Sequence, residues 1–190
     1  MKIGVFGGSF NPVHIGHLLV AQDIMEKLRL DKIIFIPAFN PPHKKYLLPF
    51  EHRWQMLKRA IAENPCFELS DIEKKRGGKS FTIDTLTELK NEFPRDRLYF
   101  IMGTDQYAEL ASWREPKHLF NLAKIVVIQR PGFGQKKFEV KKPIFIKVIQ
   151  IDIASADIRQ RIRQKSSVRY MLPEKVWQYI ISHRLYLNAK

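Results

Sequence analysis

A glycine-rich turn followed by two histidines constrains this chain more than any other feature of its sequence. The stretch reads Gly7-Gly8-Ser9-Phe10-Asn11-Pro12-Val13-His14-Ile15-Gly16-His17. The apolar run at residues 2–6 before it predicts a buried strand, and the helical spacing of apolar residues over 18–28 predicts a helix after it. The sequence therefore indicates a strand, a tight turn and a helix that opens with the two histidines.

This arrangement has the chemistry of a phosphate site. The two glycines have no Cβ and let the backbone approach a ligand closely. The free N–H groups of a helix start favour an anion, and two histidines three residues apart leave the same face of a helix. We expect His14 and His17 to point together at a bound phosphate.

The rest of the chain alternates between strands and helices. This alternation predicts an α/β fold, a Rossmann-like doubly wound parallel sheet with C-terminal helices, in which ligands bind outside the carboxyl ends of the strands. The 190 residues suit a single domain whose C-terminal helical part covers about 153–190. Strands are expected at 32–36, 67–72, 98–102, 125–128 and 144–151, helices at 50–62, 83–93, 155–164 and 173–183, and a charged loop at 73–79.

Composition narrows the class of protein further. Cys66 is the single cysteine, which excludes an internal disulfide framework and suits the cytoplasm. No apolar run is long enough to cross a bilayer, and the chain starts with a strand instead of a signal peptide, so we expect no membrane association. The net charge of +14 invites an RNA-binding interpretation, but the basic residues are scattered, and a solvated surface is favoured.

The opening motif resembles that of the nucleotidyltransferases that carry His-x-Gly-His on a Rossmann-like sheet. In that family the paired histidines stabilise the α-phosphate of a nucleoside triphosphate under attack. The resemblance implies that Gly7, Gly8, Ser9 and Phe10 bind ATP. Asn11 stands where many members carry aspartate, a change that leaves the turn chemistry intact.

Two further stretches resemble the nicotinate-nucleotide branch of this family. Pro41-Pro42-His43-Lys44 matches a loop in which Lys44 is expected to contact phosphate. The run Ser80-Phe81-Thr82-Ile83-Asp84-Thr85 is similar to one that holds the nicotinate carboxylate, which points to Thr82 and Thr85. Gly103-Thr104-Asp105 closes a strand where a ribose would lie, so Gly103 and Asp105 are expected to bind ATP. The resemblance also implies that Trp113 stacks on the pyridine ring.

The segment Ile153-Ala154-Ser155-Ala156-Asp157-Ile158-Arg159 is similar to a second family motif that grips the β- and γ-phosphates. Ser155, Ile158 and Arg159 are carried over as ATP-binding or catalytic residues. Ala154 and Ala156 replace hydroxyl residues of the motif, which puts some side-chain contacts with the triphosphate in question.

The resemblance implies transfer of the adenylyl group from ATP to nicotinate mononucleotide, giving nicotinic acid adenine dinucleotide and pyrophosphate in NAD biosynthesis. His14, His17, Lys44 and Arg159 would be the catalytic groups. Mg²⁺ would bridge the ATP phosphates, because no cluster of carboxylates stands out as a protein cage for a metal.

Alternatives stay open at this point. One alternative is that the acceptor is nicotinamide mononucleotide, phosphopantetheine or another phosphorylated compound. Others are that the chain is an RNA-binding module or a nucleotide sensor without chemistry. We expect no nucleic-acid partner. A homo-oligomer is left open.

Overall fold

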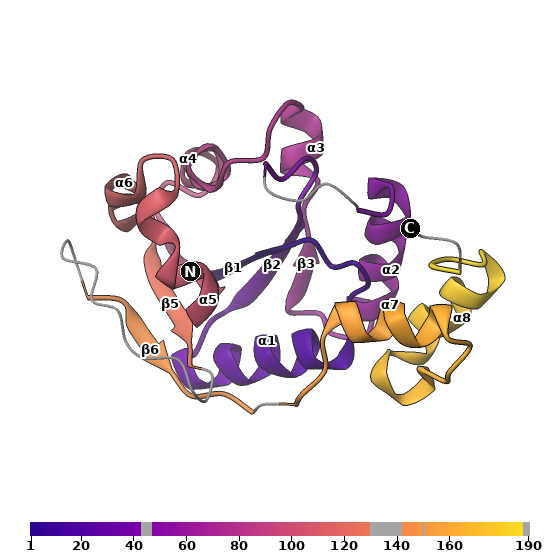
Figure 1. Cartoon of the computed structure of the whole chain (residues 1–190). Helices are drawn as coiled ribbons and strands as arrows, with labels where there is room; N and C mark the ends of the chain where they lie inside the picture. Colours follow the sequence, from indigo (N-terminus) through magenta and orange to yellow (C-terminus); the bar gives the residue numbers. More distant parts are fainter. Residues whose placement is uncertain (43–46, 130–141, 150, 188–190) are drawn as a thin grey trace.

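The described residues of the chain form a single parallel sheet with helices on both faces. A computed structural model describes residues 1–42, 47–129, 142–149 and 151–187. The strands are β1 (Lys2–Gly8), β2 (Lys32–Pro37), β3 (Phe67–Leu69), β4 (Arg97–Gly103), β5 (Lys124–Ile128) and β6 (Ile144–Ile146). Their order is β3-β2-β1-β4-β5-β6, and every neighbouring pair is parallel. This is the doubly wound architecture expected from the sequence (Figure 1).

Two apolar layers hold the helices against the sheet. Alternate residues of each central strand face opposite layers, so Ile33 and Phe35 join one core cluster and Ile34 and Ile36 the other. The first cluster packs under α1 (Ile15–Leu28), α2 (Phe50–Ile61), α7 (Ser155–Arg163) and α8 (Glu174–Ser182). The second packs under α4 (Thr82–Glu92), α5 (Thr104–Ala108) and α6 (Pro116–Leu122). The remaining elements are α3 (Ile72–Arg76) and the single turns Leu110–Ser112 and Arg169–Met171.

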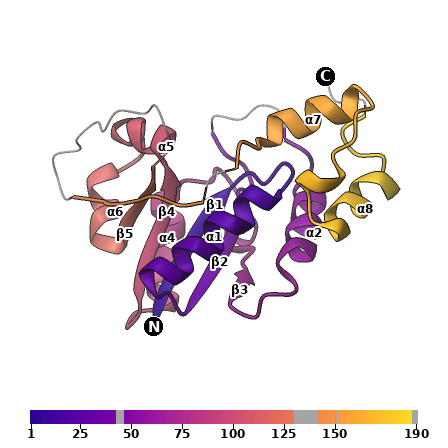
Figure 2. The same ribbon diagram turned by 90° about the horizontal axis from the view of Figure 1, so that it is seen from below.

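The C-terminal helices extend the first layer beyond the edge of the sheet. Figure 2 shows α7 and α8 grouped beside α2, at the end of α1 where β1 finishes. Ile158 and Val176 are fully buried there, in the same cluster as Leu57 of α2. In the described ranges, no helix combines the length and apolar character needed to span a bilayer.

The direction of winding changes between β1 and β4. The chain runs outward from β1 to β2 and β3, and then returns to β4 on the other side of β1. The carboxyl ends of β1 and β4 therefore border a crevice, which is where such sheets bind ligands. Gly7 and Gly8 end β1, and Gly103 ends β4.

Three expected elements differ from the structure. The expected strand at 67–72 ends at Leu69, and the expected loop at 73–79 contains α3, because the Glu73 carboxylate turns inward to bond the Phe39 N–H and the Thr85 hydroxyl. The expected strand at 144–151 ends at Ile146. Beyond it the Ile149 N–H bonds the Asp23 carboxylate instead of a strand.

Asp23 of α1 holds the segment that follows β6 against the helix. Its Oδ2 accepts hydrogen bonds of 2.8 Å from Lys27 Nζ and from the Ile149 N–H, and Lys27 also donates to the Lys147 carbonyl. The hydrogen bond from Lys27, helped by the Ile149 N–H, holds the pKa of Asp23 below its ordinary value despite burial. A carboxyl whose folded pKa is lowered adds stability above its unfolded pKa and loses it as the pH falls through the folded value.

Asp23→Asn should lower the free energy of unfolding by about 1 kcal/mol at pH 7, because a charged acceptor is replaced by a neutral one. The difference from the parent should begin to shrink as the pH falls below about 4, the ordinary pKa of an aspartate, and should vanish only at the lower pH where the folded carboxyl is protonated too. Urea unfolding of both proteins between pH 7 and pH 3 measures this. A difference that does not change with pH would show that packing, not charge, is lost.

Candidate active site

His14 and His17 lie together at the start of α1, as the sequence predicts. His14 is the residue that caps the helix, and its backbone N–H donates to Nδ1 of His17 at 3.2 Å. The two rings lie 3.7 Å apart between centroids. Because Nδ1 of His17 accepts this hydrogen bond, the neutral ring carries its own proton on Nε2 and can donate only from that atom.

Gly16 makes room for the first imidazole. A Cβ on Gly16 would lie 3.0 Å from Nδ1 of His14, closer than ordinary contact allows. The glycine between the two histidines is therefore required because it leaves space for the His14 ring, and not because the backbone there is left-handed.

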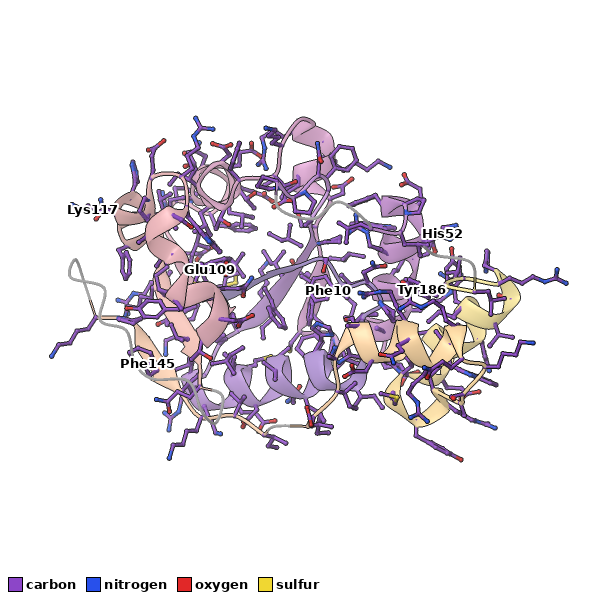
Figure 3. All side chains as sticks on the ribbon, viewed as in Figure 1. Phe10, His52, Glu109, Lys117, Phe145 and Tyr186 are labelled. Atoms are coloured by element: carbon purple, nitrogen blue, oxygen red, sulfur yellow. The ribbon has the colours of Figure 1, made fainter. Side chains whose placement is uncertain are left out.

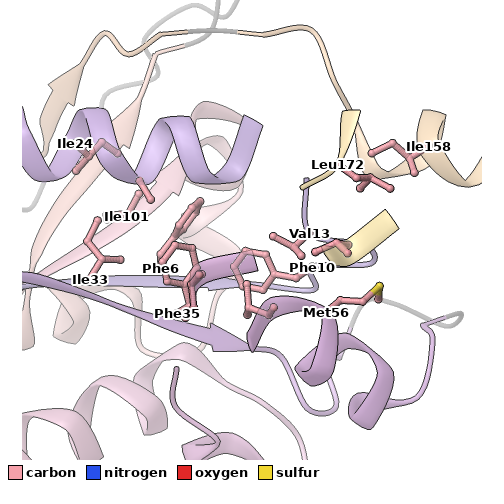
Figure 4. Packing of buried hydrophobic residues seen from close by; sticks show 14 of the residues in the cluster. Phe6, Phe10, Val13, Ile24, Ile33, Phe35, Met56, Ile101, Ile158 and Leu172 are labelled. Atoms are coloured by element: carbon pink, nitrogen blue, oxygen red, sulfur yellow. The ribbon is translucent and has the colours of Figure 1, made fainter. Parts of the chain in front are cut away.

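The turn before the histidines has an unusual backbone. Phe10 has φ 44°, a left-handed conformation that costs a non-glycine residue about 1 kcal/mol or more. Its ring is 1% exposed and packs edge-on against Phe6 and His17, with centroids 5.7 and 5.1 Å away (Figure 4). A Cβ on Gly8 would press on this ring at 3.1 Å, whereas one on Gly7 would meet only Phe100 at 3.9 Å. Gly8 is thus required by packing, whereas a Cβ on Gly7 would find room.

Donors from distant parts of the chain hold the acceptors of this turn. Arg53 of α2 donates to the Ser9 carbonyl at 3.0 Å. Arg159 donates to the Asn11 carbonyl at 2.7 Å, and the Ser155 hydroxyl donates to the Pro12 carbonyl at 2.9 Å. The Tyr186 hydroxyl donates to Oδ1 of Asn11 at 2.9 Å. Figure 3 shows Phe10 and Tyr186 near each other beside α7.

Arg53 and Tyr186 are the site residues that the sequence analysis missed. Arg53 lies three residues after Phe50 and four before Leu57, both buried, so its position on the apolar face of α2 was a signal. Burial lowers the pKa of Arg53 and raises the pKa of Tyr186, because each charged form is less well solvated there. No feature of the sequence near Tyr186 pairs it with Asn11.

The turn at residues 7–13, called the phosphate turn after the site that the sequence predicts there, borders a cavity of about 710 Å³ at the carboxyl ends of the strands. The cavity brings together most of the residues expected to bind the two substrates. Its lining includes Gly7, Gly8, Ser9, Thr82, Thr85, Asp105 and Trp113. Gly103 lies beside it, where a Cβ would collide with the Asp105 carboxylate.

Some predicted residues take other places. Ile158 is fully buried in the core, so its side chain supports α7 and does not face a ligand, contrary to the expectation. The Ser155 hydroxyl proton is committed to the Pro12 carbonyl. Lys44, together with His43, lies outside the described residues.

A buried polar network forms the wall of the cavity around Thr85. The Thr85 hydroxyl donates to Oε1 of Glu73 at 3.0 Å and accepts from Arg76 at 3.0 Å. Oε2 of Glu73 accepts the Phe39 N–H at 3.1 Å, and Arg76 also pairs with Glu88. Thr85 therefore links α3, α4 and the segment after β2, and its hydroxyl is already occupied by protein groups.

The comparisons with known proteins agree with this geometry. A family model described as cytidylyltransferase-like matches residues 5–161. A probable nicotinate-nucleotide adenylyltransferase of Geotalea uraniireducens is 39% identical over 216 aligned positions that cover 100% of both chains. One of Thermus thermophilus is 42% identical over 98% of this chain and 100% of its own. In both relatives the match spans the whole protein.

Solved structures have the same fold. A Plasmodium falciparum nicotinic acid mononucleotide adenylyltransferase complexed with NaAD gives a TM-score of 0.83 at 24% identity and covers 97% of each chain. The same enzyme complexed with APC gives 0.80 at 23% identity, covering 97% of this chain and 96% of that one.

Gly16→Ala tests the role of the glycine between the histidines. Alanine is favoured over glycine inside a helix by about 1 kcal/mol, so the variant should be as stable as the parent. Its Cβ should displace the His14 ring, and pyrophosphate release from ATP should fall at least about tenfold. Thermal unfolding and turnover are measured side by side. An unchanged rate would show that the His14 ring tolerates the displacement.

Proposed function

The chain belongs to the nicotinate-nucleotide adenylyltransferase family, and we propose that its phosphate turn and the adjoining cavity perform the reaction of that family. The enzyme transfers the adenylyl group of ATP to nicotinate mononucleotide, giving nicotinic acid adenine dinucleotide and pyrophosphate, in NAD biosynthesis. The observation that supports this placement best is the paired imidazoles at the start of α1, next to a cavity that shares Gly7, Gly8 and Ser9 with the turn.

The chemical step needs no general base. An oxygen of the mononucleotide phosphate, already an anion near neutral pH, forms a bond to the α-phosphorus of ATP. The bond from that phosphorus to the bridging oxygen breaks, and pyrophosphate leaves with the electron pair. Catalysis is then mainly alignment of the two substrates and stabilisation of charge. We assign His17 Nε2 and the His14 ring to the α-phosphate oxygens, where negative charge develops.

Arg159 is assigned to the leaving phosphates. One of its N–H groups bonds the Asn11 carbonyl, and the guanidinium has further donors for phosphate oxygens. Ser155 contributes indirectly, because its hydroxyl donates to the Pro12 carbonyl and so helps to hold the turn. Lys44 remains a predicted phosphate contact.

Mg²⁺ is proposed to arrive with ATP. Within the described part of the chain, no three His, Cys, Asp or Glu side chains are grouped to hold a metal ion, and the phosphate oxygens with water suit its octahedral shell. Bound in this way, Mg²⁺ would neutralise charge on the triphosphate.

The mononucleotide is placed in the cavity. Trp113 lines it and packs edge-on against Phe100, with centroids 6.3 Å apart, so one face of the indole can stack on a pyridine ring. Thr82 opens α4 at the cavity wall, and the free N–H groups of a helix start favour the nicotinate carboxylate. Thr85 is a positioning residue in this proposal, because Glu73 and Arg76 occupy its hydroxyl.

Nicotinate mononucleotide should support pyrophosphate release from ATP and Mg²⁺ far better than nicotinamide mononucleotide. The neutral amide cannot match donors that are arranged for a carboxylate, a mismatch that costs a factor of about 100 or more where buried groups stay unpaired. A coupled pyrophosphate assay with both acceptors measures the ratio of kcat/KM. Equal kcat/KM values for the two mononucleotides would leave the proposed adenylyl transfer in place and contradict the proposed pocket for the nicotinate carboxylate.

His17→Ala should reduce kcat by about two orders of magnitude or more, the usual effect of losing a donor to developing charge. Circular dichroism and thermal unfolding should match the parent, since the ring is only half-buried. His118→Ala is the matched control, because that histidine lies on α6 and is about half exposed. A His17→Ala enzyme with near-parent kcat would remove this ring from the transition state.

A further inference from the structure

Arg53 is a buried cation without a matching carboxylate. Only 1% of the residue is exposed, and it is the largest of the fully buried side chains. Its Nε donates to the Leu48 carbonyl at 2.8 Å and its NH1 nitrogen to the Ser9 carbonyl at 3.0 Å. Among the ion pairs of the described residues none involves Arg53, and Glu73 and Glu51 attract it only at longer range.

Such a group is costly for a protein to keep. Removing a charge from water is unfavourable, and backbone carbonyl oxygens return only part of the lost solvation. Desolvation accordingly lowers the pKa of Arg53, yet a guanidinium stays protonated at any physiological pH. An apolar side chain of similar volume on this face of α2 would avoid the cost of burying a charge, but it would leave the Leu48 and Ser9 carbonyls without these donors. The two carbonyl contacts are therefore what an arginine supplies here.

The hydrogen bond from Arg53 to the Ser9 carbonyl helps to hold the turn in its conformation. Ser9 precedes Phe10, whose left-handed backbone would relax if the turn were not held on both sides. The Ser9–Phe10 peptide is trans, so fixing the Ser9 carbonyl toward Arg53 also fixes the Phe10 N–H on the opposite side of the peptide plane. Arg159, Ser155 and Tyr186 hold the acceptors farther along the turn, and Arg53 holds the first of them.

We propose that Arg53 is a positioning residue for ATP, which fixes the Ser9–Phe10 peptide of the phosphate turn and supplies a buried positive charge behind the triphosphate. The proposal rests on the proposed function, in which this turn binds the phosphates. The charge acts through the turn and does not touch the substrate. Because it lies in the interior, its attraction for the phosphates is screened less by salt than that of a surface lysine.

Two substitutions separate charge from hydrogen bonding. Arg53→Lys keeps a positive charge and one donor direction, whereas Arg53→Gln keeps an N–H donor and removes the charge. Arg59→Gln is the matched control, since Arg59 lies on the same helix, donates to Gln55 and stacks over Tyr179 away from the turn. Each protein is titrated by calorimetry with ATP and Mg²⁺ without the mononucleotide, and then with adenosine, which has no phosphate.

Arg53→Gln should raise the Kd for ATP about tenfold or more, the effect expected when a charge-assisted interaction is lost, and leave the Kd for adenosine within about twofold. Arg53→Lys should lie between this variant and the parent, and Arg59→Gln should bind ATP as the parent does. Equal ATP affinity in Arg53→Gln and the parent, or equal losses for ATP and adenosine, would overturn the proposal and leave Arg53 a structural residue.

A pH profile of Arg53→Lys gives an independent test if Arg53→Gln does not fold. Burial lowers the pKa of an ammonium group, so the substituted side chain should lose its charge as the pH rises from 8 to 10. ATP affinity should fall over that range relative to the parent, whose guanidinium keeps its charge. Parallel profiles for the two proteins would contradict a role for the charge.

The turnover of His17→Ala shows which idea has failed. If that variant keeps parent activity, the turn is not the phosphate site, and the proposed function falls together with the role of Arg53. If His17→Ala is inactive while both Arg53 variants bind ATP as the parent does, only the inference about Arg53 is wrong.

Discussion

The proposed catalytic arrangement depends on the hydrogen bonds that fix the turn between β1 and α1. Its acceptors at Ser9, Asn11 and Pro12 bond to donors that are 44 to 175 residues away in sequence. A turn of this length, with a left-handed Phe10, would sample other shapes if it were free. Held in this way, the turn keeps the two imidazole rings together at the start of α1, the arrangement on which the proposed reaction depends. Preorganisation of this kind is the main contribution that a protein makes to phosphoryl transfer.

The C-terminal helices are part of this mechanism and not an appendage to the sheet. α7 brings Ser155 and Arg159 to the turn, and the segment after α8 brings Tyr186. Their apolar faces join the same core cluster as α1 and α2, so the packing that stabilises them also sets the position of their polar groups. We therefore expect a substitution deep in this layer to affect the proposed phosphate site through the turn.

The parts that were predictable from the sequence are those encoded locally. Continuous apolar runs mark the central strands because both faces of a parallel sheet are covered, and the spacing of His14 and His17 places both rings on one helix face. The remaining features depend on tertiary contacts. The strand that begins at residue 144 is shorter than expected, and beyond it the Ile149 N–H donates to the Asp23 carboxylate. α3 forms where the Glu73 carboxylate accepts hydrogen bonds from Phe39 and Thr85, on two other segments. Arg53 was detectable as a charge on an apolar face, but its contact with Ser9 was not.

Asn11 shows how one residue type affects the charge of the whole site. Its side-chain oxygen accepts a hydrogen bond from the buried Tyr186 hydroxyl. Because the pKa of Tyr186 is raised, this hydroxyl stays a neutral donor. Both Arg53 and Arg159 are close enough to Tyr186 to oppose that rise. A carboxylate in place of the Asn11 amide would neutralise part of this positive potential. The neutral amide accepts the same hydrogen bond without adding negative charge, so both guanidinium charges keep the roles toward the triphosphate that we propose for them.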